Sequence, residues 1–442
     1  RYRLEDQRTW FESSRQARLD VRQTSRMTRG SAAGAHGLPG LLLFSAVGVA
    51  SCTNFAAIAG YTPVSDVGRV TALGQAIEAV DAAIDEEPRD WTAAVAAYEN
   101  ATSSIVSLRN VLPSPANGRT PVDAFTAHYG SDDYMHEFVS LALRGEGKFA
   151  LEGKLRKELA MKGIVLQGVL MASMTSLHDA VRSCREGNAG DFDGAPHYVD
   201  YAWALYACSE AQGPIRLAEK RAPQFDVEAT HKSEAGGSKV NVRLLALFET
   251  LQASAQQGNC VRMQELVPKA IALMQVPVIQ GMLREAYEVD PKEVEEHRGA
   301  DGFVEVAEGW AFTRAVLPAI GACSAEAADT IQRNMDTLGL GPQGPHIPDG
   351  YEAVKAAVES TYPCLGISCA DVNAMVDPWK TGQLLWVPCS DAALTTTTQQ
   401  VDATGDADVT SGAKVTRISA WNLVGAVIVV GSLQVRAARS AA

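Results

Sequence analysis

The chain has 442 residues, a net charge of −13 and a sequence pI of about 5.2. This length is sufficient for one large domain or two ordinary domains, each with a hydrophobic core. The acidic balance argues against a nucleic acid as a partner, because proteins that bind nucleic acids present basic patches to the phosphates. The composition is instead typical of an acidic protein that is soluble or exposed at a surface.

Residues 27–51 have the layout of a secretory signal, with Arg29 before an apolar run and small residues at its end. The run is broken by glycine and lacks the alternation that a buried strand would show. We expect cleavage before Ser51, with a bacterial lipobox that ends at Cys52 as the alternative. Residues 1–26 are Arg-rich and precede this signal, so we interpret them as a gene-model extension upstream of the true start.

Residues 52–390 show the apolar spacing of amphipathic helices. In the stretch 68–85, an apolar residue recurs every three or four positions, at Val70, Leu73, Ile77, Val80 and Ile84. A second helical stretch begins after Asp90, which is a suitable N-cap. Further helices are expected at 155–183, 239–258, 261–289, 302–318 and 351–361. Because alternation typical of strands is scarce, the sequence predicts an all-α multi-helix bundle.

Two regions of the chain match each other at an offset of 107 residues. The stretch KELAMKGIVL from Lys157 aligns with QELVPKAIAL from Gln264, and Trp203 aligns with Trp310. This repeat predicts a duplicated helical hairpin whose two Trp-bearing helices pack on a shared core.

The eight cysteines are scattered and include no CxxC pair of the kind that zinc sites use. In a secreted chain, disulfide bonds are the expected fate of such cysteines. The sequence therefore predicts a disulfide-bonded ectodomain but not the pairing of its cysteines.

The two Trp-bearing helices carry oxygen donors three residues apart, on one face of each helix. Carboxylate and phenolate oxygens are hard donors that suit ferric iron. The alternative is that the tyrosines pack in a core with their hydroxyls at its edge and that the glutamates face water. The metal candidates on these helices are His197, Tyr198, Asp200, Tyr201, Glu305 and Glu308.

A second group of possible ligands lies in the stretch HYGSDDYMHEF, which begins at His128. Its metal candidates are Asp132, Asp133, His136 and Glu137. The alternative is a helix N-terminus, with Ser131 as the cap and the acidic residues complementing the helix dipole. The stretch alone does not decide between these two interpretations.

No sequence motif points to catalysis. The chain has no HExxH, no phosphate-binding P-loop and no GxSxG nucleophile elbow. A helical di-iron oxidase would need Glu-x-x-His on two helices. Such a pair occurs at Glu228 and His231, in a stretch whose Lys, Gly and Ser content is typical of a loop. We therefore expect a protein that is not an enzyme.

The C-terminal part of the chain is expected to tether the protein. Residues 391–417 are rich in Thr, Asp and Gly and poor in large apolar side chains, which is typical of a disordered stalk. Residues 418–442 contain an apolar stretch followed by Arg436 and Arg439. This segment fits either a short membrane span with its basic end inside or a removable GPI signal. Both alternatives place the folded part outside the plasma membrane.

Five stretches of the chain resemble a known family. They include YGSDDYMHEFVSLAL from Tyr129, AEGWAFTRAVLPAIGACSAEAADTI from Ala307 and CLGISCADV from Cys364. In these stretches, which span about residues 70–375, the chain is similar to the algal low-iron-inducible periplasmic proteins, also called Fe-assimilating or high-CO2-inducible proteins. Before its aromatic helix, that family has an acidic residue followed by Glu and Gly, where this chain has Asp200, Tyr201 and Ala202. Ala222 stands where the family has a cysteine.

The resemblance implies a secreted or surface protein that is expressed under iron limitation and captures iron for uptake. Its partners would be iron ions and a plasma-membrane iron transporter or reductase. By this resemblance, the possible iron ligands are Asp132, Asp133, Glu305 and Glu308. The absence of the family's cysteine at position 222 implies a different disulfide pattern near Cys208. Two alternatives stand beside this hypothesis, namely a structural or adhesive surface protein that binds cations non-specifically and a ferroxidase-like di-iron enzyme.

Overall fold

A computed structural model describes residues 55–100, 107–112, 120–295, 303–336, 347–380 and 382–391. All of them belong to the larger of two units into which the chain divides, Thr53–Ala442. The predicted gene-model extension, the secretory signal, the C-terminal anchor and nearly all of the stalk lie outside the described residues.

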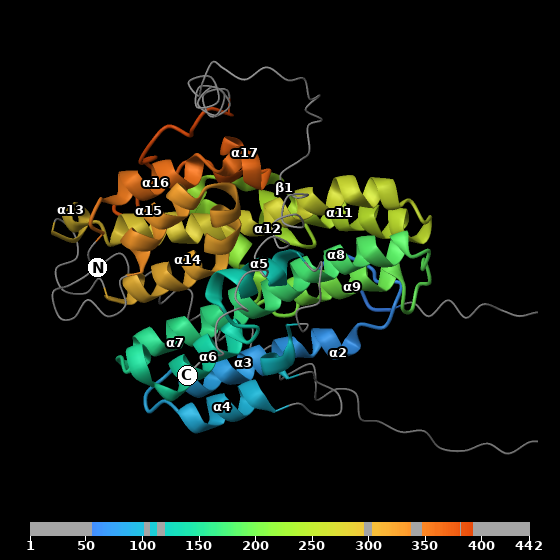
Figure 1. Cartoon of the computed structure of the whole chain (residues 1–442), viewed down its shortest axis with the longest axis horizontal. Coiled ribbons are helices and arrows are strands. Elements are labelled where there is room, and N and C mark those ends of the chain that lie inside the picture. Colours follow the sequence, from blue (N-terminus) through green and yellow to red (C-terminus); the bar gives the residue numbers. More distant parts are fainter. Residues whose placement is uncertain are drawn as a thin grey trace, which may run out of the picture. The chain divides into compact units, whose positions relative to one another are not determined.

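The described residues form helices almost throughout, which confirms the all-α prediction (Figure 1). The helices of the first half are α2 (Gly68–Thr71), α3 (Leu73–Ile84), α4 (Trp91–Glu99), α5 (Thr120–Tyr129), α6 (Tyr134–Arg144), α7 (Gly153–Lys162), the π-helical η3 (Gly163–Leu170), α8 (Met171–Arg185), α9 (Ala195–Tyr206) and α10 (Pro214–Arg221). Those of the second half are α11 (Lys239–Gln256), α12 (Cys260–Glu288), α13 (Pro291–Glu293), α14 (Phe303–Cys323), α15 (Ala325–Met335), α16 (Tyr351–Glu359), α17 (Tyr362–Leu365) and α18 (Cys369–Val372).

Local sequence explains several helix starts. The Asp90 carboxylate accepts a hydrogen bond from the Ala93 amide at 2.9 Å, so Asp90 is the N-cap of α4, as predicted. The stretch that contains Glu228 and His231 was expected to be a loop, but it forms strand β1 (Glu228–Ser233). This strand pairs antiparallel with β2 (Gly236–Ser238), and together they are the sole sheet of the described ranges. Gly236, the first residue of β2, adopts φ +115°, a backbone conformation that favours glycine.

The predicted duplication is present in the fold. The continuous helical stretch α7–η3–α8 and helix α12 begin at Gly153 and Cys260, which are separated by the offset of the sequence repeat. In each half the long helix packs against the Trp-bearing helix that follows, α8 against α9 and α12 against α14. Trp203 and Trp310 are both buried in one hydrophobic core, as the repeat predicts.

The two long helices of the repeat form the centre of this core. Gly153–Arg185 and Cys260–Glu288 are each long and apolar enough to cross a membrane. Their most apolar windows are, however, 94% and 89% buried within the fold. Because the core helices of soluble proteins have the same composition, packing inside the protein accounts for the apolarity of both helices.

Three disulfide bonds fasten the helices together, which confirms the prediction of a disulfide-bonded bundle. Cys184–Cys260 joins the end of α8 to the start of α12, Cys323–Cys364 joins α14 to α17, and Cys369–Cys389 holds the chain after α18. Cys208 pairs with no described cysteine, and burial raises the pKa of its thiol to about 12. Cys52 lies outside the described residues.

Candidate metal site

Helix α9 presents its polar candidates to the chain segment 61–65. The carboxylate of Asp200 is fully buried and accepts five hydrogen bonds. Its Oδ1 accepts from the Tyr61 hydroxyl at 2.5 Å and from Gln252 Nε2 at 2.8 Å. Its Oδ2 accepts from the amides of Val64 and Ser65, each at 2.8 Å, and from the Ser65 hydroxyl at 2.7 Å. A carboxylate has about four lone-pair sites, so Asp200 has none left for a metal ion.

Asp200 acts on His197 through Ser65. The Ser65 hydroxyl has a single proton, which we assign to the hydrogen bond with Asp200 because an ionised carboxylate can only accept. His197 Nδ1 lies 2.9 Å from the Ser65 oxygen and must then be the donor. This arrangement leaves the lone pair on Nε2 of His197. Histidines that bind metals are commonly oriented in this way, with the other ring nitrogen donating to a carboxylate or another acceptor.

His197 is half-buried and has acidic neighbours. Burial lowers the pKa of its imidazole, and the negative charges of nearby aspartates, among them Asp193 and Asp66, offset this only in part. The neutral ring that a metal ligand requires is therefore favoured at neutral pH. Asp66 and Asp193 have exposed side chains. The sequence analysis missed both residues, since Asp193 precedes α9 and Asp66 comes from a distant part of the chain.

Two tyrosines flank this histidine. The ring centroids of Tyr198 and Tyr201 lie 6.0 and 6.2 Å from that of His197, and both tyrosines are half-buried. Burial raises the pKa of the Tyr201 phenol, so at neutral pH this phenol keeps its proton and is a poor anionic ligand. Tyr198 is also held through its backbone, since its carbonyl accepts a hydrogen bond from the Ser176 hydroxyl at 2.8 Å.

The acidic candidates of the other Trp-bearing helix face basic side chains. On α14, an oxygen of Glu308 lies 3.2 Å from the ammonium of Lys162, which also lies 2.5 Å from Glu158. Although burial opposes ionisation, Lys162 and the neighbouring basic side chains lower the pKa of Glu308. The position between the two carboxylates is thus occupied by the protein's own cation. Glu305, one turn earlier, is buried.

A second buried contact between a basic and an acidic side chain joins α10 to α12. Arg221 and Glu285 are 3.2 Å apart, and their side chains are only 1% and 3% exposed. Burial, together with the charges of Glu308 and Glu288, raises the pKa of Glu285 to about 8, which outweighs the opposite effect of Arg221. At neutral pH Glu285 is therefore mostly protonated, so it accepts a hydrogen bond from Arg221 but is not an anionic metal ligand.

The two Trp-bearing helices have different polar neighbours. The α9 face contacts the segment 61–65 and Gln252 of α11, whereas Glu308 of α14 pairs with Lys162 of α7. Within the described ranges, no group of three or more His, Cys, Asp or Glu side chains is arranged to hold a metal ion. Iron binding through the paired helix faces therefore stays a prediction.

The group around Asp132 lies at the start of α6. Asp132 and Asp133 are exposed, and the helix begins after Asp133. Ser131 was predicted as the cap, but it lies two residues earlier. Its hydroxyl accepts from the Asp133 amide at 3.1 Å and donates to Glu137 at 2.7 Å. The acidic residues complement the helix dipole, which stabilises the helix.

His136 is half-buried and packs against a buried tyrosine. Its ring stacks on that of Tyr98, with centroids 5.8 Å apart, and its Nδ1 lies 3.3 Å from the Tyr98 hydroxyl. Burial lowers the pKa of His136. Packing against Tyr98 accounts for this histidine in the fold.

The fold and its cysteine bridges define a disulfide-bonded helical protein of an oxidising compartment. The sequence model of a family described as low iron-inducible periplasmic protein matches residues 40–395. The chain belongs to this family, which places it in the periplasmic or extracellular space. No curated protein and no solved structure shows significant similarity to it.

Proposed function

We propose that the protein binds iron outside the plasma membrane and aids iron assimilation, without enzymatic turnover. The family description supports a role when iron is scarce. The observation that carries the proposal is the relay Asp200–Ser65–His197, which leaves the lone pair on Nε2 of His197 while the negative charges of Asp193 and Asp66 act on the ring. Iron is the cargo of this protein rather than a cofactor.

The donor set suits iron. Imidazole nitrogens and carboxylate oxygens are both ligands that iron accepts. The described residues hold no preformed group of three such ligands, so both aspartates would have to turn toward His197 when iron binds. Asp66 uses one oxygen to accept a hydrogen bond from the Gly68 amide at 2.9 Å, and its second oxygen can turn toward the ion. Because both aspartates are exposed, iron can load from solvent and be passed on, as a carrier requires.

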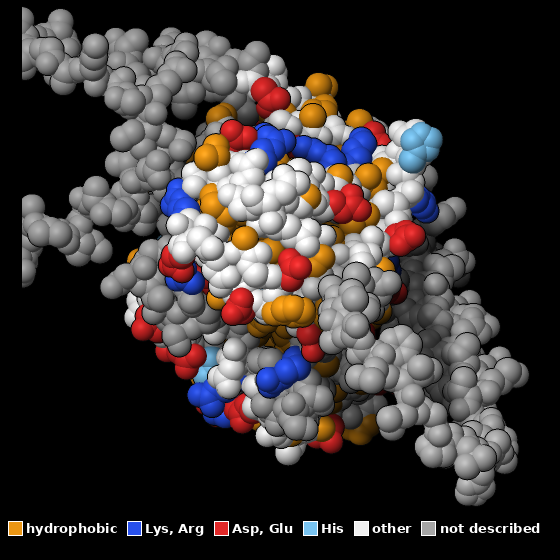
Figure 2. Space-filling view, turned by 90° about the vertical axis from the view of Figure 1, so that its right-hand side faces the viewer, with side chains coloured by type: hydrophobic (Ala, Val, Ile, Leu, Met, Phe, Trp, Pro, Cys, Tyr) orange, Lys and Arg blue, Asp and Glu red, His pale blue; other side chains and the backbone are white. Residues whose placement is uncertain are grey.

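The charges on one face of the molecule are consistent with a specific site rather than general cation binding there. On the face drawn in Figure 2, acidic side chains are mostly scattered among polar and apolar ones, and several Lys and Arg side chains lie side by side near the upper edge. The net charge of −13 still raises the local cation concentration and favours capture. A plasma-membrane transporter or reductase would receive the iron, with residues 418–442 as the tether.

Calorimetric titration of the purified protein tests this proposal. The titrants are ferrous sulfate under anaerobic reducing conditions and ferric nitrilotriacetate, with calcium chloride as the competing cation. We expect near-stoichiometric iron binding that calcium does not reproduce. His197→Gln should weaken iron binding at least tenfold. His136→Gln is the matched control, since His136 is a second half-buried histidine, and it should change the affinity less than twofold.

Three results would contradict the proposal. Equal binding of calcium and iron would favour a structural or adhesive surface protein. Unchanged iron binding in His197→Gln would refute the assignment of the site. Oxygen consumption upon addition of ferrous iron would indicate a ferroxidase-like enzyme instead of a carrier.

A further inference from the structure

A groove on the surface between α11 and α12 lies apart from the His197 site. It has a volume of about 410 Å³ and closes against the turn after α17. Three of its lining residues are basic and three are leucines, namely Arg243, Arg262, Lys269, Leu247, Leu266 and Leu273. We propose that this groove binds a small organic polycarboxylate, as a second ligand site that goes beyond iron binding.

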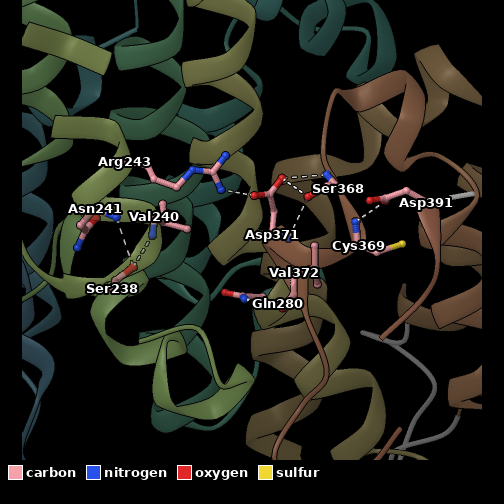
Figure 3. Close-up of polar contacts among 10 residues, drawn as sticks. All are labelled: Ser238, Val240, Asn241, Arg243, Gln280, Ser368, Cys369, Asp371, Val372 and Asp391. Carbon is pink, nitrogen blue, oxygen red and sulfur yellow. Dashed lines mark hydrogen bonds and ion pairs between the residues drawn. The ribbon is translucent and has the colours of Figure 1, made fainter. Parts of the chain in front are cut away.

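On one wall of the groove, an ion pair between Arg243 and Asp371 is held in place by further hydrogen bonds to Asp371. Arg243 reaches from α11 and donates a hydrogen bond to Asp371, while the amide and hydroxyl of Ser368 donate to the other carboxylate oxygen at 2.9 and 2.7 Å (Figure 3). Both oxygens of Asp371 are therefore engaged, which weakens its repulsion of an incoming anion. The Arg243 side chain is still 54% exposed, so the rest of its guanidinium can donate into the groove.

The opposite wall supplies two further cations. Arg262 and Lys269 are seven residues apart on α12, which puts them on one helix face about 10 Å apart along the axis. Arg262 pairs with exposed Glu265 at 2.9 Å, and such surface pairs are weak. Lys269 is exposed and forms no ion pair with an acidic residue of the described part of the chain. Three cations therefore line the groove together with a single acidic residue, Asp371, on a protein of net charge −13.

The chemistry of the groove favours a carboxylate on a carbon skeleton. Guanidinium groups match carboxylates with two parallel hydrogen bonds. Half-buried Leu247 offers contact to methylene groups, which inorganic phosphate lacks, while Leu266 and Leu273 are buried beneath the groove. The volume lies within the usual range of small-molecule sites, about 300–1,000 Å³. A di- or tricarboxylate therefore fits better than an inorganic oxoanion.

Calorimetry of the iron-free full-length protein with citrate at low ionic strength tests the proposal. We expect saturable binding with one site per chain, weakened at least tenfold by the double variant Arg262→Gln, Lys269→Gln. The matched control is Lys154→Gln, Lys292→Gln, which removes two exposed positive charges elsewhere and should change affinity less than twofold. All three proteins should give the same circular dichroism spectrum, because the substituted side chains are exposed.

Inorganic phosphate and the His197→Gln variant complete the experiment. Phosphate should bind at least tenfold more weakly than citrate, and His197→Gln should bind citrate as the wild type does. Non-saturable binding, equal losses in both double variants, or phosphate binding as strong as that of citrate would overturn the proposal. Because the protein is iron-free and the groove excludes His197, failure of this site is distinguishable from failure of the iron site.

Discussion

Asp200→Asn should destabilise the fold strongly, because this carboxylate joins three parts of the chain. It accepts hydrogen bonds from the segment 61–65 and from Gln252 while lying fully buried on α9. An amide can replace only one of the two oxygens as an acceptor. The oxygen should stay at the Oδ2 position, which has three donors, so that the new NH2 group faces the Tyr61 hydroxyl and the Gln252 amide.

The expected cost follows from those two contacts. A hydrogen bond to a charged group contributes about 1.5–3 kcal/mol, and the substitution removes two of them. The Tyr61 hydroxyl can rotate to accept from the new amide, which recovers part of the loss. We therefore expect the free energy of unfolding to fall by about 2–4 kcal/mol, a large fraction of the roughly 5–15 kcal/mol of an ordinary domain.

Urea unfolding followed by tryptophan fluorescence measures this loss. Asp329→Asn is the matched control, because Asp329 is exposed on α15, and it should change the free energy by less than about 0.5 kcal/mol. Hydrogen exchange adds a local readout, since the Val64 and Ser65 amides lose their charged acceptor and should exchange faster. A loss below about 1 kcal/mol, with unchanged exchange at both amides, would refute the reasoning.

Three further predictions concern stability. Glu308→Gln should lower the free energy of unfolding in urea by about 2–4 kcal/mol, because it removes one of the two carboxylates that compensate Lys162. Adding Lys162→Gln should recover part of this loss. If the losses of the two substitutions simply add, the two side chains are not paired. Glu285 has a pKa raised to about 8 in the fold, so its contribution to stability is full below its ordinary pKa of 4.5 and is lost as the pH rises toward 8. Between pH 4.5 and 8, Glu285→Gln should therefore reduce the slope of the free energy of unfolding against pH by up to about 1.4 kcal/mol per pH unit. An unchanged slope would contradict the raised pKa of Glu285. Replacing Cys184 and Cys260 by serine should lower the free energy of unfolding by about 4 kcal/mol, because their disulfide closes a loop of 76 residues. A thermal unfolding midpoint equal to that of the wild type would exclude this contribution.

Much of the fold could be predicted from the sequence because its signals are local or periodic. The apolar stripe at Val70, Leu73 and Ile77 lies buried in α3, as its spacing indicates. The repeat placed Trp203 and Trp310 in one core because the two halves conserve the spacing between the long helix and the Trp-bearing helix. The disulfide pairing was out of reach, since spacing in the sequence does not say which cysteines meet in space.

The candidate site could be predicted only in part. Residue type and spacing identified His197 and Asp200, but not that Asp200 is saturated by donors about 52 to 139 residues away in the chain. In the same way, nothing near Glu308 in the sequence indicates that Lys162 lies against it. Helical spacing shows which face a side chain is on, whereas the partner of that face depends on tertiary packing.

The central claim is that iron binds at Nε2 of His197. An anomalous difference map at the iron absorption edge, from a crystal of the protein grown with iron, locates the ion directly. The account predicts a peak within bonding distance of His197 Nε2, with the carboxylates of Asp66 and Asp193 turned toward it. A peak at the start of α6, beside Glu305, or at no protein site would contradict the account.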